Sequence, residues 1–240
     1  MTEATVPGAQ TLDDAAFFRK ITTVLVVVIV LGFAQNALLG RAAYAYSLIW
    51  PHVHGAVMLA WLALHGFQAR HAAAGNLAMH RKLGWLGAFL AVAVVGTMSY
   101  SGIAALRSGN VPPFFAPAYF LALTQVGAVV FGGLVFAAIT RRSQSDYHRR
   151  LMTGALILLL NPALGRILPM PLMGGWGGWA CLAIELLVVA VIAAHDTRKL
   201  GRIHPSTAMV GAILAMGEVL VALSATSPVI QGIAADIAGG

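Results

Sequence analysis

Charged residues and cysteines are both scarce in this sequence. Only 10% of the 240 residues are Asp, Glu, Lys or Arg, whereas a soluble domain carries about 25%. Cys181 is the only cysteine and lies within an apolar run, which excludes a disulfide framework and a thiolate metal site. With 59% hydrophobic residues, the composition is typical of an all-α, polytopic membrane protein and not of a soluble domain.

Several familiar functional signals are also missing. Glu3, Asp13 and Asp14 precede the first apolar run, so no cleaved signal peptide is predicted. There is no phosphate-binding glycine loop, nucleophile elbow or zinc-protease motif. The histidines are too scattered for the histidine boxes of a di-iron desaturase. The net charge of +7 comes from short basic clusters between apolar runs without interleaved aromatics, so no nucleic-acid partner is predicted.

Long apolar runs dominate what is present. A helix needs about 20 apolar residues to cross a hydrocarbon core roughly 30 Å thick, and continuous runs indicate helices, not barrel strands. Seven transmembrane helices are predicted, with the fifth interrupted by an Asn-Pro pair. Their ranges are 21–39, 51–70, 83–105, 116–139, 151–168, 175–194 and 207–227.

The basic residues suggest how these helices are oriented. With seven spans, all the Lys and Arg residues except Arg41, Arg107 and Arg166 fall on one side of the membrane. Cytoplasmic loops carry such an excess, so we expect the N-terminus inside and the C-terminus outside, in a bacterial inner membrane and in contact with its lipids. The expected division is a cytoplasmic segment 1–20, a transmembrane domain 21–228 and a short outer tail 229–240.

Two stretches repeat a His-Arg pattern directly before apolar runs, MHRKLGWLG at 79–87 and YHRRLMTGA at 147–155. His80 and His148 would lie at matching depths on two parallel helices, where two imidazoles can hold a haem iron axially. The alternative is that both stretches are only membrane anchors. Basic residues that could pair with haem propionates are Arg81, Lys82, Arg149 and Arg150.

The stretch PHVHG adds His52 and His54 at the outer start of the second span. Residues two apart on a helix do not face each other, so these two are not a chelating pair. His54 and His65 are eleven apart, which returns them to one helix face about 16 Å apart. His54 is a candidate metal ligand, whereas His65 has the alternative of a core histidine bonded to a neighbouring helix.

Three further ionisable residues fall within the predicted spans: Arg166, Glu185 and Glu218. Intramembrane charges are candidates for functional sites. With His54 and His65 they define a possible intramembrane polar site. One interpretation is a structural ion pair between Arg166 and Glu218, and the other is a proton or substrate path.

The stretch HGAVMLAWLALHGFQARHAAAGNLAMHRKLG at 54–84, with the later YHRRLM, resembles two groups of proteins. One is a family of uncharacterised bacterial multi-pass proteins with HR-x-x-G and HR-x-x-M helix starts. The other is the transmembrane b-type cytochromes, whose four-helix haem core would correspond to 51–168. This resemblance implies that His80 and His148 match the cytoplasmic ligand pair and that His54 matches one outer ligand. The span 116–139 contains no histidine, so at most one bis-histidine haem is expected.

The leading hypothesis is therefore an electron-transfer protein of the membrane that binds haem b, with a quinone or another small molecule as redox partner. It would be a component of a membrane oxidoreductase. A single haem near the cytoplasmic face does not by itself carry electrons across the membrane. The alternative is a small transporter, or a ligand- or metal-binding membrane protein, without haem. An outer site on His52, His54 and Glu218 would then take a substrate, a quinone or a metal.

Overall fold

The computed structural model describes residues 7–41 and 48–240, with side chains from residue 14 onward. This part of the chain forms helices and no strands. The first six residues of the expected cytoplasmic segment lie outside it. The helices are α1 (Pro7–Leu38), α2 (Ile49–Ala73), α3 (Leu77–Arg107), α4 (Pro117–Thr140), α5 (Ser145–Leu158), α6 (Asn161–Ile167), α7 (Met170–Met173), the short 3-10 turn η2 (Gly174–Trp176), α8 (Gly177–Leu200), α9 (Pro205–Thr226) and α10 (Pro228–Gly239).

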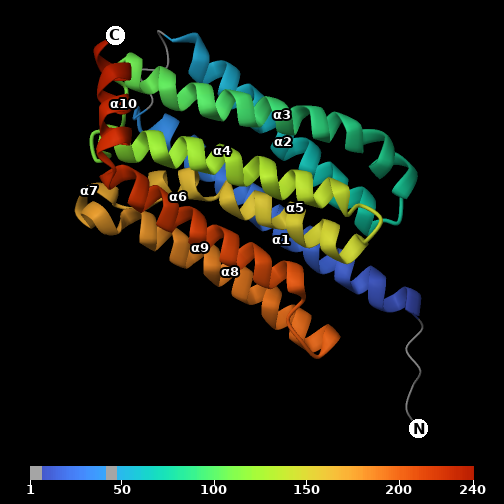
Figure 1. Ribbon diagram of the computed structural model, residues 1–240. Helices are drawn as coiled ribbons and strands as arrows, with labels where there is room; N and C mark the ends of the chain where they lie inside the picture. Colours follow the sequence, from blue (N-terminus) through green and yellow to red (C-terminus); the bar gives the residue numbers. More distant parts are fainter. Residues whose placement is uncertain (1–6, 42–47) are drawn as a thin grey trace.

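The long helices lie side by side and alternate in direction (Figure 1). The start of α1 and the α2–α3, α4–α5 and α8–α9 turns lie at one end, on the right in Figure 1, which we call the basic end because most Lys and Arg residues cluster there. The C-terminus, the α3–α4 turn and α7 lie at the opposite end, which we call the far end. The start of α1 and the end of α10 therefore lie at opposite ends of the bundle.

Six helical segments in the described residues are long and apolar enough to cross a membrane, so the chain is a multi-pass membrane protein by length and composition. The second expected span, 51–70, is not among the six. Its helix, α2, has 25 residues, but four histidines lower its hydropathy. The six segments are Asp14–Leu38, Leu77–Arg107, Pro117–Thr140, Ser145–Ile167, Met170–Leu200 and Pro205–Thr226.

Proline and glycine set many of the helix boundaries. Pro117, Pro205 and Pro228 occupy the first turns of α4, α9 and α10, where a missing N–H costs nothing. Gly75 and Gly201 follow the ends of α2 and α8 with φ of 72° and 71°, the left-handed conformation that ends helices at glycine. These turns keep the connections at the basic end short.

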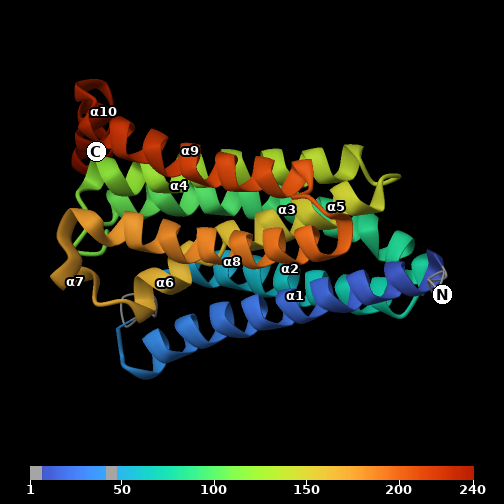
Figure 2. The same cartoon turned by 90° about the horizontal axis from the view of Figure 1, so that it is seen from below.

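The fifth apolar run is a broken helix. α5 ends at Leu158, and α6 begins at Asn161 with Pro162 in its first turn, because proline cannot donate a backbone hydrogen bond. Figure 2 shows α5 and α6 between α1 and α9, with α8 in front of them. The break lies at the centre of the bundle, where Leu159 and Leu160 are buried.

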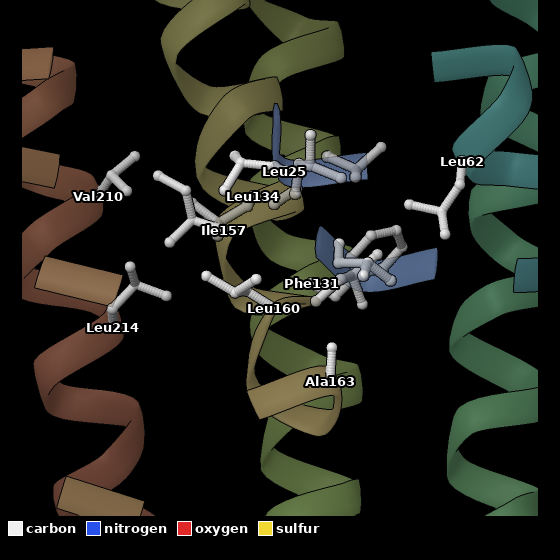
Figure 3. Close-up of a cluster of buried hydrophobic side chains, with 14 of the residues drawn as sticks. Leu25, Leu62, Phe131, Leu134, Ile157, Leu160, Ala163, Val210 and Leu214 are labelled. Carbon is white, nitrogen blue, oxygen red and sulfur yellow. The ribbon is translucent and has the colours of Figure 1, made fainter. Parts of the chain in front are cut away.

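Five helices surround the interior in which the candidate site lies. Neighbouring pairs are α1 and α2, α2 and α3, α3 and α4, α4 and α5, and α5 and α1, so these helices form a closed ring. At mid-height the apolar core includes Leu25, Leu62, Phe131 and Ile157, whose side chains are grouped together in Figure 3. α8 and α9 pack outside this ring, with α9 against α4 and α5.

Both expected end segments contain helix. α1 begins at Pro7, so much of the expected cytoplasmic segment 1–20 is already helical. The expected tail 229–240 is also largely helical. α10 packs against α3, α4 and α9 at the far end, where Ala234 is buried beside Leu106 and Leu121.

Candidate functional site

The structure brings His80 and His148 together at the basic end of the five-helix ring. His80 lies in the first turn of α3 and His148 in the first turn of α5. Their ring centres are 6.0 Å apart and their planes are nearly perpendicular, at 88°. α3 and α5 are not neighbours in the ring, so the two imidazoles meet across its interior.

The Nδ1 atom of each imidazole is hydrogen-bonded to a backbone carbonyl. His80 Nδ1 lies 3.3 Å from the Gln68 carbonyl of α2, and His148 Nδ1 lies 2.9 Å from the Ala138 carbonyl of α4. Ala138 is in the last turn of α4, where carbonyls lack partners within the helix. With Nδ1 as the donor, Nε2 is the acceptor in both rings, which is the arrangement that metal-binding histidines use.

His65 extends this histidine pair deeper into the ring. It is 8% exposed and lies within electrostatic range of both His80 and His148. Its ring stacks on Trp61 at 4.9 Å, and Trp61 in turn meets Phe131 edge to face at 5.0 Å. These two aromatic side chains fill the ring at mid-height, so the three histidines form a cluster that ends at Trp61.

One polar atom in this region lacks a partner. The side-chain oxygen Oε1 of Gln68 is buried and accepts no hydrogen bond. Buried polar atoms are nearly always paired, and the Gln68 backbone carbonyl is the one that faces His80. The Gln68 side chain lies against Gly84 of α3, so the unpaired Oε1 acceptor lies where α2 and α3 pack together.

The metal-binding capacity of the site is limited to paired ligands. Among residues 7–41 and 48–240, no three His, Cys, Asp or Glu side chains are grouped closely enough to hold one metal ion. Pockets of about 470 and 220 Å³ lie elsewhere, one beside Arg107 and Asp236 and the other beside Val26 and Phe67. A group larger than a metal ion would therefore have to part α3 from α5.

Arg81 and Arg149, which were expected to pair with haem propionates, differ in their exposure and in their ion-pair partners. Arg81 is exposed on α3. Arg149 pairs with Asp14 of α1 at 2.6 Å and with Asp146 at 2.9 Å. His195 of α8 also contacts Asp14, at 2.6 Å. Arg149 is thus already neutralised by two carboxylates, whereas Arg81 can contact a ligand or lipid headgroup.

His54 does not join the histidine pair. It lies about 16 Å from His65 along α2, on the far side of Trp61, where its Nδ1 atom is 3.3 Å from the hydroxyl of Thr97. Arg166 lies within electrostatic range of His54. Arg166 donates to the Pro162 carbonyl at 2.7 Å, and its guanidinium is 4.1 Å from the ring centre of Phe33. The chain therefore has separate polar regions in its two halves.

The two intramembrane glutamates form a third region, outside the ring. Glu185 of α8 and Glu218 of α9 are 3% and 7% exposed and lie within electrostatic range of each other. Glu218 accepts a hydrogen bond from Tyr119 at 3.1 Å, a partner that replaces the ion pair with Arg166 considered above. Glu185 bonds to the side chain of Asn161.

Sequence reasoning missed a buried ionic network at the basic end. Arg150 of α5, 2% exposed, donates to Asp196 of α8 at 3.0 Å through Nε. Asp196 also accepts from the Thr207 hydroxyl and from the His204 backbone at 3.2 Å. The only available sequence signal was an Asp in the basic segment HDTRK, which is more typical of a solvated helix end.

The chain matches no family model, no curated protein and no solved structure.

Proposed function

We propose that this chain is a membrane redox protein that holds a b-type haem between His80 and His148. The observation that carries the proposal is the 6.0 Å separation of the two ring centres. A metal–imidazole bond is about 2 Å long, so two imidazoles on opposite sides of one metal have ring centres roughly 6 Å apart. His80 and His148 would therefore hold the iron from α3 and α5, and the porphyrin would have to part these two helices.

The surroundings of His80 and His148 support the same interpretation. Both Nδ1 atoms face backbone carbonyls, which leaves Nε2 as the ligand atom. Trp61 and Phe131 exclude water from the inner side. The exposed Arg81, next to His80 in sequence, offers a cation to the ligand's carboxylates. When bound, haem supplies one-electron chemistry, and a quinone is the redox partner that the membrane offers.

The proposal includes seven spans. α2 has 25 residues, which at 1.5 Å per residue gives about 37 Å, enough to cross a core of roughly 30 Å. It lies between α1 and α3 in the ring, both long enough to cross a membrane. The basic end then faces the cytoplasm of a bacterial inner membrane. Cysteines introduced at Arg41 and at Ala74, before and after α2, should react with an impermeant maleimide from opposite sides.

The test of haem binding is an absorption spectrum of the protein purified from cells supplied with a haem precursor. A Soret band that shifts on reduction, with sharp α and β bands, is expected from bis-histidine haem. His80→Ala and His148→Ala should each abolish these bands. His71→Ala, another histidine at the basic end, is the matched control and should retain them. A featureless visible spectrum from folded protein overturns the proposal.

A second candidate function is that of a transporter or ligand-binding protein without haem. It is favoured by two buried polar atoms on the far side of Trp61, Trp50 Nε1 and Ser101 Oγ, which lack hydrogen-bond partners. Both lie one helical turn from the His54–Thr97 contact, on α2 and α3. A ligand that stabilises the wild type against heat, but not His54→Ala, would support this function in a haem-free protein.

A further inference from the structure

The third polar region, that of the two glutamates, lies outside the five-helix ring, between α8 and α9. Its carboxyl groups belong to Glu185 and Glu218, and both are buried. The polar side chains that interact with them come from three elements. They are Tyr119 of α4, Asn161 of α6 and Cys181 of α8.

The backbone of α8 comes close to this site at Gly178. A Cβ atom at Gly178 would overlap both the Glu218 carboxylate and the Tyr119 hydroxyl. Glycine therefore lets α8 approach the hydrogen bond between these two side chains, which are 99 residues apart in sequence. Gly178, Cys181 and Glu185 recur at helical spacing, so the same face of α8 carries the gap and the second carboxyl group.

Glu185 is incompletely bonded. Its carboxyl group interacts with Asn161, but its Oε1 atom is buried and has no hydrogen-bond partner. No Lys, Arg or His in the described residues forms an ion pair with Glu185 or Glu218. The two carboxyl groups are also close enough to repel each other when both are ionised.

An ionised carboxylate buried without a cation is costly, and two such charges side by side are more so. A neutral carboxylic acid removes both costs. Glu218 has the Tyr119 hydroxyl as a donor, which suits an ionised group, whereas Glu185 has a free oxygen where a proton can sit. We propose that Glu185 and Glu218 form a proton-binding site in which Glu185 is a neutral carboxylic acid at neutral pH.

Asp196 provides an internal control for this proposal. It lies on the same helix, α8, and is 0% exposed, but Arg150 donates to it through Nε and Nη2. It is therefore held as a carboxylate. A reagent that selects neutral carboxylic acids in apolar surroundings should distinguish the two groups even though both are buried.

The experiment is labelling of the full-length protein, in detergent and in liposomes, with dicyclohexylcarbodiimide. This hydrophobic reagent adds across the O–H of a carboxylic acid, and the adduct rearranges to a stable N-acylurea without losing atoms. Peptide mass mapping should find the label on Glu185 at neutral pH and not on Asp196. Glu185→Gln should remove this label and leave the rest of the peptide map unchanged.

Two results would overturn the proposal. One is equal, background labelling of Glu185 and Asp196 across the pH range. The other is protection of Glu185 by Na⁺ at constant pH, which would assign a cation site instead. Infrared spectra give a second readout: a carboxylic C=O band that shifts in D₂O should be present in the wild type and weaker in Glu185→Gln. Neither measurement depends on haem, so the two proposals can fail separately.

Discussion

Helix α8 carries two buried carboxyl groups in opposite settings. Asp196 at the basic end and Glu185 eleven residues earlier are 0% and 3% exposed. Asp196 is surrounded by donors from Arg150, Thr207 and the His204 backbone. Glu185 has a bond to Asn161 and one oxygen without a partner.

The comparison shows that burial alone does not determine what an intramembrane acid does. Asp196 ties α5, α8 and α9 together through a buried ion pair, so its charge is part of the architecture. Glu185 has no such partner, so its charge state is free to change. Environment sets two roles for one type of chemical group, as it does for paired carboxyls in enzymes.

The largest effect is expected from breaking the Asp196 network. Arg150→Met leaves a buried carboxylate without its cation, which typically costs roughly 3–5 kcal/mol. The free energy of unfolding should fall by about this amount in mixed detergent micelles. The double variant Arg150→Met/Asp196→Leu should recover most of the loss, because neither charge remains. If the single and double variants are equally unstable, the pair is not the cause.

The next effect concerns the gap at Gly178. Gly178→Ala places a methyl group on the Glu218–Tyr119 contact, and overpacking of this kind costs about 1–3 kcal/mol. Gly175→Ala is the control, because nothing lies within 4 Å of the added atom. Thermal unfolding of the two variants should separate them, and adding Tyr119→Phe to Gly178→Ala should reduce the loss.

Much of the fold could be predicted because long apolar runs leave few alternatives in a membrane. The run at 116–139 corresponds to α4 within one residue, whereas α3 begins six residues before the run at 83–105. The run at 51–70 forms α2, but its histidines lower the mean hydropathy below that of the six membrane-spanning segments. One of them, the buried His65, also belongs to the histidine cluster of the candidate site.

The site itself was only partly predictable. His80 and His148 each precede an apolar run that starts on the same side of the membrane, so the sequence alone places them at a similar depth. Their closeness could therefore be anticipated. Contacts between distant segments could not. Tyr119 and Gly178 gave no signal of a carboxyl site, because an ordinary helix-start tyrosine and a glycine within a Gly-Trp-rich turn are typical of membrane interfaces.

A smaller effect is expected from Glu185→Gln. If Glu185 is a neutral acid, an amide of the same shape changes no charge and keeps the bond to Asn161, so stability should change by less than about 1 kcal/mol. Asp196→Asn is the matched comparison and should cost several times more, because it removes the carboxylate closest to the buried Arg150 and leaves it only the more distant Asp14 and Asp146. Similar losses in the two variants would mean that Glu185 is also ionised. Chemical denaturation in one detergent can compare them directly.

The smallest effect concerns His204, which lies between α8 and α9 and caps α9 by accepting from Ser206 N at 3.2 Å. Burial lowers the pKa of His204 below its usual 6.5, and the charge of nearby Arg150 lowers it further. Above pH 6.5 the imidazole is neutral in both the folded and the unfolded chain. As the pH falls through this value the unfolded chain binds the proton first, so the free energy of unfolding decreases.

His204→Asn removes this proton uptake but keeps an N-cap acceptor, since asparagine caps helices well. The wild type should therefore lose stability more steeply than the variant from pH 7 towards pH 5. The difference in slope should stay below the roughly 1.4 kcal/mol per pH unit of one full proton. Parallel plots of unfolding free energy against pH for the two proteins would show that His204 binds its proton equally well in the folded and the unfolded chain.

Arg150 both binds Asp196 and disfavours a proton on His204. The same pair of curves can be measured in the Arg150→Met/Asp196→Leu background. If the difference in slope between His204 and the His204→Asn variant disappears there, the pH response depends on the buried ionic network.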